Sequence, residues 1–288
     1  MNIDFHTHGL VSKRVDFDRE LFLQGIEFAK EIGLDAILLS EHFNAKGFKE
    51  IYNFLRNNFD YMGDCYVVNG IFVFPALEVN VEEKGHVILS GNRDNIELVH
   101  DFLEPYFHKE NFINIKDLLN LADSYNLLKI GAHPFRRGQK LYMQDKEQLK
   151  RLDLVDLNAK DIYKRGLMAV REELQIFSKE IDVKIITGSD SHYPIQLGSI
   201  YTELDKSCKT IEEIKKVVEK EQYSIEMSKS FILRIKAAKY SKRSYVKELN
   251  KYNWNEDVSN TDTSFYCVPG MNNNLTVKVR CGLGSGNH

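Results

Sequence analysis

The chain has 288 residues, of which 43% are hydrophobic and 28% are charged, a mix typical of globular proteins that bury a sizeable core. The formal net charge is −3 with neutral histidines, so no global field favours nucleic acid or an anionic membrane. No apolar run approaches about 18 residues, so no transmembrane helix is expected. No basic and apolar leader precedes Asp4 and His6, and the four cysteines form no C-x-x-C pair. We therefore expect a cytoplasmic protein with reduced thiols.

Short apolar runs alternate with amphipathic stretches along most of the chain. Strands are predicted at 2–5, 36–40, 71–79, 87–90, 128–132, 154–158 and 184–187. Helices are predicted at 17–32, 48–59, 96–107, 115–125, 144–151, 166–180 and 210–220. About seven strand–helix units favour an α/β fold with a parallel sheet, closed as a distorted (βα)7 TIM-like barrel, while an open doubly wound sheet stays possible. No G-x-G-x-x-G or P-loop follows a predicted strand, so a nucleotide-binding fold has no support.

The composition changes after about residue 235. The stretch 236–251 carries one acid, Glu248, and six basic residues, namely Lys236, Lys239, Lys242, Arg243, Lys247 and Lys251. From Ser259 onward the chain is rich in Asn, Gly, Ser and Thr. We predict one domain at 1–235, followed at 236–288 by a basic helix and a poorly ordered tail. The helix could contact nucleic acid or lipid, but a solvated basic face is favoured because its apolar face is weak.

Histidines gather at the ends of the predicted strands. His6, His8, His42, His133 and His192 lie at or just after carboxyl ends, whereas His86 lies at a strand start. Four carboxylates accompany them, namely Asp4, Glu41, Glu78 and Asp190. In a strand–helix barrel the carboxyl ends converge on one mouth. Packing explains such a set poorly, because each buried imidazole would need a partner.

The spacing within two of these motifs supports a metal site. His6 and His8 are two residues apart on a strand, so both side chains face the same side, and Asp190 and His192 repeat the spacing. Imidazoles combined with carboxylates suit Zn, Mn or Fe, and Glu78 could bridge two ions through its two oxygens. His100, His108 and His288 have no ligand spacing.

Other chemistries have weaker support. No G-x-S-x-G nucleophile elbow is present, and no cysteine lies in a strand-end motif. A glycosidase with paired carboxylates is possible in a barrel, but it would leave the histidines unexplained.

Four short motifs occur in a fixed order over roughly residues 1–200. They are DFHTHG at 4–9, SEH at 40–42, ALEVN at 76–80 with His86, and AHPFR at 132–136 with GSDSH at 188–192. This ordered set resembles the polymerase-and-histidinol-phosphatase (PHP) family. The resemblance implies a distorted seven-unit barrel with up to three metals at its mouth, and members that hydrolyse phosphate esters, including histidinol phosphate, or act as nucleases. The SEH motif is similar to that of the histidinol-phosphatase branch.

The resemblance also implies a ligand set. The first metal would be held by His6, His8, Glu78 and Asp190, the second by Glu78, His86 and His133, and the third by His42 and His192. Family members commonly supply another His or Asp soon after the first motif, where this chain reads GLVSKRVD at 9–16. We therefore expect two or three divalent ions (Zn, Mn or Fe) per chain. Arg14 is expected to place positive charge where the third ion would lie, and Asp16 is the rival as a missing ligand.

The predicted activity is metal-dependent hydrolysis of small phosphate monoesters, with a metal-activated water attacking phosphorus. Arg136, just after the strand that ends near His133, is predicted to contact the phosphate, since a guanidinium suits bidentate phosphate binding. One alternative is a nuclease or phosphodiesterase acting on nucleic acid or nucleotides. Another is a degenerate metal-binding domain. Nucleic acid is a possible but not a favoured partner, and no membrane partner is expected.

Overall fold

The computed structural model describes residues 1–253, so the predicted tail from Ser259 onward lies outside the described residues. The strands are β1 (Asn2–Thr7), β2 (Ala36–His42), β3 (Tyr61–Met62), β4 (Cys65–Val68), β5 (Ile71–Asn80), β6 (His86–Ser90), β7 (Leu128–Ala132), β8 (Leu154–Asn158), β9 (Lys184–Gly188), β10 (Ile200–Leu204) and β11 (Tyr223–Met227). The helices are α1 (Arg19–Glu31), α2 (Phe48–Asn58), α3 (Arg93–Phe102), α4 (Ile115–Ser124), α5 (Lys146–Leu149), α6 (Ala159–Arg165), α7 (Leu167–Ile181), α8 (Ile211–Glu219) and α9 (Phe231–Asn253). Within residues 1–253, no helix combines the length and the apolar character needed to cross a bilayer.

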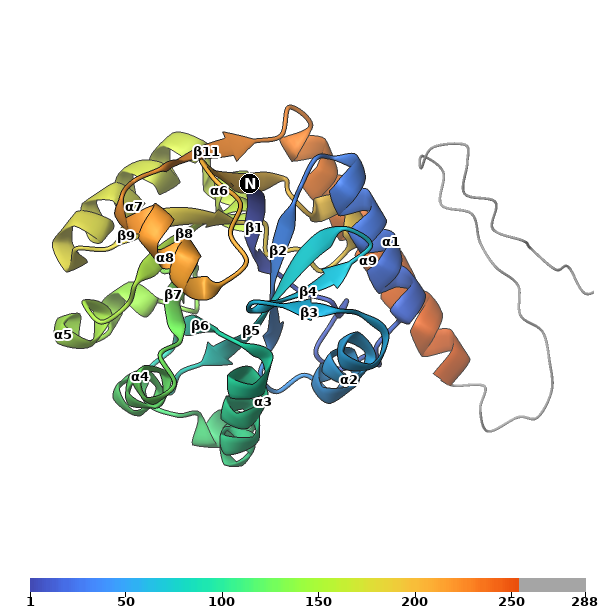
Figure 1. The fold of residues 1–288 in the computed structure, drawn as a ribbon, viewed down its shortest axis with the longest axis horizontal. Helices are drawn as coiled ribbons and strands as arrows, with labels where there is room; N and C mark the ends of the chain where they lie inside the picture. The colour runs from blue at the N-terminus through green and yellow to red at the C-terminus, as the bar shows by residue number, and fades with distance from the viewer. Residues whose placement is uncertain (254–288) are drawn as a thin grey trace, which may run out of the picture. The chain divides into compact units, whose positions relative to one another are not determined.

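Seven strands form a distorted barrel in the order β1-β2-β5-β6-β7-β8-β9, with helices around it (Figure 1). The barrel closes where the segment after β9 lies against β1. There Asp190 N donates to His6 O at 2.7 Å, and His8 N donates to Ser191 O at 2.9 Å. Gly188 permits this approach, because a Cβ at that position would lie 2.2 Å from the Cβ of His6. The predicted α/β barrel is therefore confirmed.

The expectation of a wholly parallel sheet is wrong at β6. This strand pairs antiparallel with both β5 and β7. Only residues 81–85 join β5 to β6, and a connection this short cannot make the crossover that a parallel pair requires. Reversal places the first residue of β6 beside the last residues of its neighbours, since His86 pairs with Asn80 and with Ala132. A histidine at a strand start thus reaches the same mouth as histidines at strand ends.

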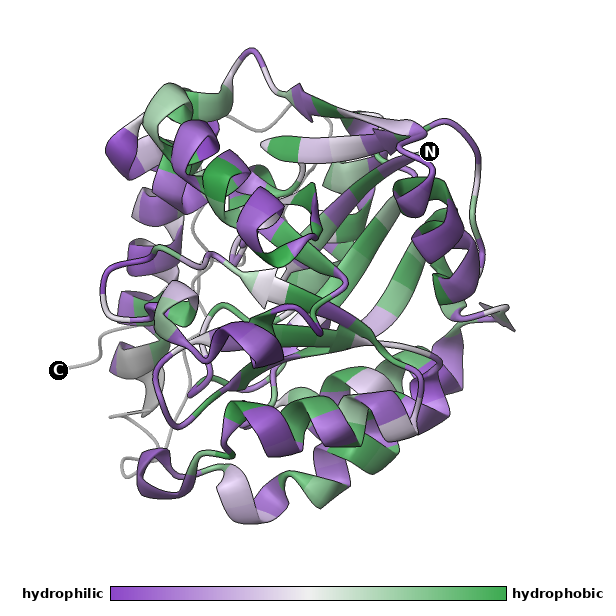
Figure 2. Ribbon diagram, turned by 90° about the vertical axis from the view of Figure 1, so that its left-hand side faces the viewer, coloured by the Kyte–Doolittle hydropathy of each residue, from purple (hydrophilic) through white to green (hydrophobic). Residues whose placement is uncertain are grey.

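Several short elements lie outside the predicted set. β3 and β4 form a hairpin, and β4 pairs with β5. β10 pairs antiparallel with β1, and β11 pairs antiparallel with β10, so the two extend the sheet beyond the barrel. The strands of the barrel are largely hydrophobic, and the outward faces of the helices are hydrophilic (Figure 2). This pattern is expected where apolar side chains fill the barrel and the layer beneath the helices.

The predicted C-terminal helix is present as α9, which starts earlier than expected. Phe231, Ile235 and Ala238 are buried, and the first two belong to the hydrophobic core of the barrel domain. Among the described residues, Met1–Arg243 forms one compact unit. The predicted boundary at residue 235 lies within α9, and the domain limits stay a prediction.

Arg234 holds α9 to the segment that follows His192. Its guanidinium donates to the carbonyl oxygens of Ile195 (3.0 Å), Gly198 (3.2 Å) and Leu197. It also lies over the ring of Phe28, 5.1 Å from the centroid. Burial lowers the pKa of Arg234 to about 10, although Asp4 opposes the shift.

Replacing Arg234 with Ala should therefore lower the free energy of unfolding by about 2–4 kcal/mol, because three buried carbonyl groups lose a charged donor. Urea unfolding followed by circular dichroism would measure the change. Lys236→Ala, on the exposed side of the same helix, is the matched control. Equal stability of the two variants would show that the contacts contribute nothing.

Candidate metal centre

The mouth of the barrel brings together all eight residues predicted as metal ligands. Each is buried or almost so, and they come from six strand ends that are distant in sequence. β1 and the residue after it supply His6 and His8, β2 supplies His42, β5 supplies Glu78, β6 supplies His86, the residue after β7 is His133, and the segment after β9 supplies Asp190 and His192. Their roles as ligands stay a prediction, but their convergence is a property of the fold.

Glu78 lies at the centre, with each of its two oxygens facing a different set of imidazoles. Oε1 lies 3.6 Å from His6 Nε2, 2.6 Å from His86 Nδ1 and 3.0 Å from His133 Nε2. Oε2 lies 3.7 Å from His8 Nε2 and 2.8 Å from His42 Nδ1. A carboxylate divided in this way has the arrangement of a bridge between two cations.

Three groups of side chains have ligand atoms close enough to share one ion, within 4.8 Å of one another. They are His6–His8–Asp190, His6–Glu78–His133 and His8–His42–His192. Within the first group, His8 Nε2 lies 3.4 Å from Asp190 Oδ1. Ligand atoms about 3.4 Å apart are expected around a tetrahedral ion with bonds of about 2.1 Å. His86 belongs to none of the three groups, although it contacts Glu78.

Unpartnered ring nitrogens point to a cation more directly than the distances do. The atoms His6 Nε2, both nitrogens of His8 and His133 Nδ1 are buried without a hydrogen-bond partner. A buried polar atom without a partner costs free energy, so such atoms are rare in folded proteins. A divalent ion coordinated by these nitrogens removes that cost, and the residues present fit such an ion.

The electrostatics of the cluster also favour a cation. Burial alone would raise the pKa of Glu78, but His86, His42 and His6 hold it well below its usual range. Burial would lower the pKa of His6, yet Glu78 and Asp190 raise it to about 10. The carboxylates of Glu78 and Asp190 therefore favour positive charge beside His6, which a bound cation would supply.

A layer of polar residues behind the ligands was not predicted from the sequence. Asp156, on β8, has Oδ2 2.7 Å from His6 Nδ1 and also accepts from the backbone N–H of His133. An ionised carboxylate can only accept, so the proton lies on Nδ1 and Nε2 of His6 is left free for an ion. Asn158 Nδ2 donates to the same carboxylate at 3.0 Å. The sequence LVDLN at 154–158 could have indicated these residues, because two polar side chains on one face of a buried strand need hydrogen-bond partners.

Arg136 is held by the protein itself. Its guanidinium donates to Asp190 Oδ2 at 2.6 Å, Asn158 Oδ1 at 2.6 Å and Asp161 Oδ1 at 3.3 Å. Every nitrogen of the fork thus has an acceptor on the protein. Arg136 is therefore better placed to position Asp190 than to contact a phosphate.

Arg14 and Asp16, in the stretch after the first motif, were expected near a third ion, but the structure does not place them there. Arg14 is exposed and forms no hydrogen bond or ion pair with the clustered side chains, so its expected role near the third ion has no geometric support. Asp16 is also exposed and pairs with Lys46 at 2.7 Å. Lys13 is the residue that turns inward, because its Nζ donates to Asn80 Oδ1 at 3.1 Å. The residue that lies close to His42 and His192 is His8, and not a residue of this stretch.

Two of the carboxylates at strand ends have structural partners. Asp4 accepts from the backbone N–H of Ser189 at 2.9 Å and of Gly198 at 2.8 Å, and burial raises its pKa to about 6. Glu41 accepts from Leu10 N at 2.9 Å and lies 3.5 Å from His8 Nδ1. Asp4 therefore ties β1 to the segment after β9, while Glu41 borders the cluster.

Two lysines stand beside the cluster on elements outside the four motifs. Lys160 Nζ lies 2.8 Å from Asp190 Oδ1 and 3.2 Å from His192 Nδ1. Lys242, on α9, is half-buried and interacts electrostatically with Lys160, Asp190 and Glu41. Burial lowers the pKa of Lys242 to about 8, and the nearby charge of Lys160 contributes to the same shift.

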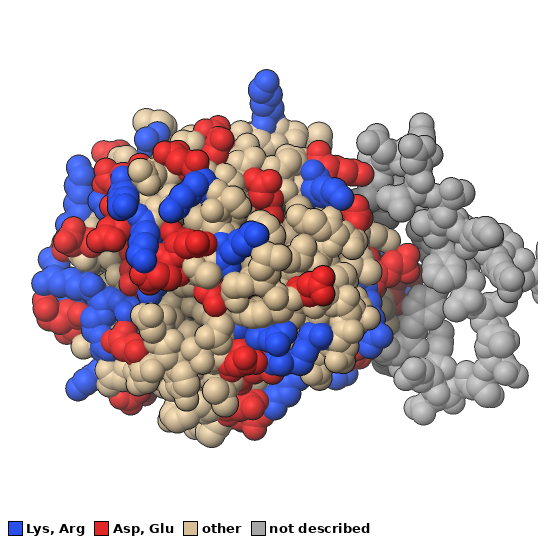
Figure 3. Space-filling model, in the orientation of Figure 1, with Lys and Arg blue, Asp and Glu red and all other residues tan. Residues whose placement is uncertain are grey.

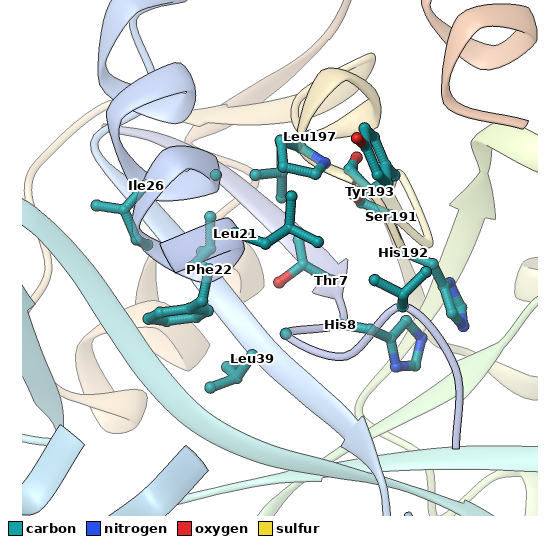
Figure 4. A pocket seen from close by; sticks show the side chains of 15 residues that line it. Thr7, His8, Leu21, Phe22, Ile26, Leu39, Ser191, His192, Tyr193 and Leu197 are labelled. Carbon is teal, nitrogen blue, oxygen red and sulfur yellow. Dashed lines mark hydrogen bonds between the residues drawn. The ribbon is translucent and has the colours of Figure 1, made fainter. Parts of the chain in front are cut away.

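A small apolar cavity lies beside His8 and His192, between α1 and the barrel. His8 and His192 line one side, and Leu21, Phe22 and Leu197 are among the apolar residues of the other (Figure 4). The cavity measures about 30 Å³, which is room for one or two water molecules. It is too small for a substrate.

The comparisons with known proteins give the fold a context. No family model and no curated protein matches the chain. Among solved structures, the chain is similar to PsfC from Pseudomonas syringae, with a TM-score of 0.69 and 19% identity over 85% of this chain and 98% of PsfC. It is also similar to a two-domain protein from Bacteroides vulgatus that contains a predicted PHP-like metal-dependent phosphoesterase, with a TM-score of 0.53 and 16% identity over 81% of this chain and 68% of that one.

A further similar structure is the lesion-specific endonuclease PfuEndoQ from Pyrococcus furiosus, with a TM-score of 0.56 and 20% identity. The match covers 78% of this chain and 57% of the endonuclease. At these identities the likenesses show the fold. The barrel of this chain is similar to those of PsfC and of the protein that contains the predicted PHP-like phosphoesterase, which confirms the fold that the resemblance implied.

Proposed function

We propose that this chain is a hydrolase of phosphate monoesters that depends on divalent metal. The observation that carries the proposal is the set of buried, unpartnered imidazole nitrogens around Glu78. His6, His8, Glu78 and Asp190 would hold one ion, while Glu78, His86 and His133 would hold a second. A third would take His42 and His192, since His8 offers a single lone pair and is already used. Divalent ions of this kind polarise a phosphoryl oxygen and make a bound water acidic enough to react at neutral pH.

The remaining residues of the mouth orient the ligands. Asp156 fixes the ring of His6, and Arg136 holds Asp190 through one carboxylate oxygen. Asn80 lies 2.6 Å from His86 Nε2 and fixes that ring against Glu78. Held in this way, His6 and Asp190 need little rearrangement when an ion binds, which favours both affinity and catalysis.

A nuclease is the second candidate, and the likeness to a lesion-specific endonuclease favours it. A nuclease needs an extended basic surface for the nucleic-acid backbone. The net charge of −3 gives no such field, and on the described part of the face seen in Figure 3 basic and acidic side chains are interspersed. We therefore propose a small monoester as the substrate.

Protein purified without chelator should release phosphate from a panel of small monoesters and should not nick labelled DNA. Removing the metal should reduce turnover more than about 100-fold, and Mn, Zn or Fe should restore it. His8→Ala should lose activity, whereas His108→Ala, which removes an exposed histidine outside the cluster, is the matched control. Full activity in excess chelator would refute metal dependence, and DNA nicking without phosphate release would favour the nuclease.

A further inference from the structure

We propose that Lys160 and Lys242 form a phosphate-binding pair at the rim of the metal centre. The inference rests on the proposed function, since it assigns residues that would hold the substrate's phosphate dianion. Neither lysine lies in a metal-ligand motif, and the two come from different elements, the start of α6 and the middle of α9.

The position of Lys160 places a cation beside the ligands. Its ammonium lies within hydrogen-bond distance of Asp190 and His192, and its side chain is 31% exposed. It therefore borders both the cluster and solvent, as a substrate contact requires. Arg136, by contrast, has all its nitrogens engaged by the protein.

The position of Lys242 follows from the buried face of α9. Phe231, Ile235 and Ala238 are buried along one side of the helix, and Lys242 follows Ala238 by four residues, one turn further on the same side. Arg234 fixes this part of the helix to the segment after His192. Lys242 is accordingly half-buried on this side of the helix, near enough to Lys160 and Asp190 to interact with them electrostatically, whereas Lys239 is exposed.

The charges explain why an anion belongs between the two lysines. In the structure, Asp190 offsets the positive charge of Lys160, and Asp190 and Glu41 do so for Lys242. A divalent ion bound by Asp190 would take up that negative charge. The two ammonium groups would then face each other with less compensation, which is unfavourable in a half-buried place. A phosphate dianion would restore the balance through charge-assisted hydrogen bonds.

The test uses the full chain loaded with Mn and inorganic phosphate as the probe, followed by calorimetry at constant ionic strength. Lys160→Ala and Lys242→Ala should each weaken phosphate binding by about 10- to 100-fold, since each removes one charged hydrogen bond. Lys242→Arg should retain most of the binding. Lys164→Ala and Lys239→Ala, which remove exposed lysines from the same two helices, are the matched controls.

Metal content measured on the same samples separates binding from support of Asp190. Unchanged phosphate affinity in both variants would overturn the proposal. Loss of metal together with loss of phosphate binding would also overturn it, because Lys160 would then act only through Asp190. If the lysines hold phosphate but the wild-type protein hydrolyses no monoester, the subsite stands and the proposed function fails.

Discussion

Glu78→Gln should remove the bridging ligand from the metal centre and lower turnover by about 1,000-fold or more, because the ions supply several kcal/mol of transition-state stabilisation. The amide keeps the shape of the carboxylate but removes the negative charge that faces five imidazoles. It also turns an NH₂ group toward one set of histidines. Both neighbouring ions should therefore be weakened by a single change.

Elemental analysis of the purified variant would measure the loss of metal, and phosphate release would measure turnover. Glu83→Gln is the control, because Glu83 is exposed in the turn between β5 and β6. Full metal content and full turnover in Glu78→Gln would refute the bridging role. Loss of one ion alone would place Glu78 at a single site.

Asp156→Asn should weaken metal binding by about 10- to 100-fold while leaving the fold intact, since residues behind metal ligands commonly contribute this much. The Asn oxygen can still accept one hydrogen bond, but the negative charge that fixes the tautomer of His6 is gone. The backbone N–H of His133 also loses its ionised acceptor.

A competition titration against a metal-binding dye would give the affinity directly. Asp153→Asn is the control, because Asp153 precedes the same strand and accepts from the backbone of Lys129 rather than from the cluster. Equal affinities for the two variants would mean that Asp156 supports the barrel and not the ions.

The convergence of the eight candidate ligands could be predicted because each lies in a short motif next to an apolar run. His6 and His8 follow a buried strand, and barrel geometry then determines that strand ends meet. Reversal of β6 could not be read from periodicity, because parallel and antiparallel strands that are buried on both faces look alike. Only the short connection at 81–85 indicated it.

The supporting residues were harder to find, each for a definite reason. Asp156 and Asn158 lie on a strand that was predicted correctly, yet a partner across the barrel is set by register and not by sequence. Lys242 lies on a helix predicted as a solvated basic face. Its direction depends on where Arg234 fixes α9, and no local pattern contains that information.

The closure of the barrel by its first strand has a consequence for the time at which the protein can acquire metal. His6 leaves the ribosome roughly 180 residues before Asp190, which at about 5–20 residues per second is a delay of roughly 10–40 s. A nascent chain would have to close that loop at an entropic cost to present both ligands. The proposed ion affinity thus belongs to the folded barrel, and an ion that binds only the native state would stabilise that state against unfolding. On the proposed function, the choice among divalent ions would then be made by the completed site and not by the nascent chain.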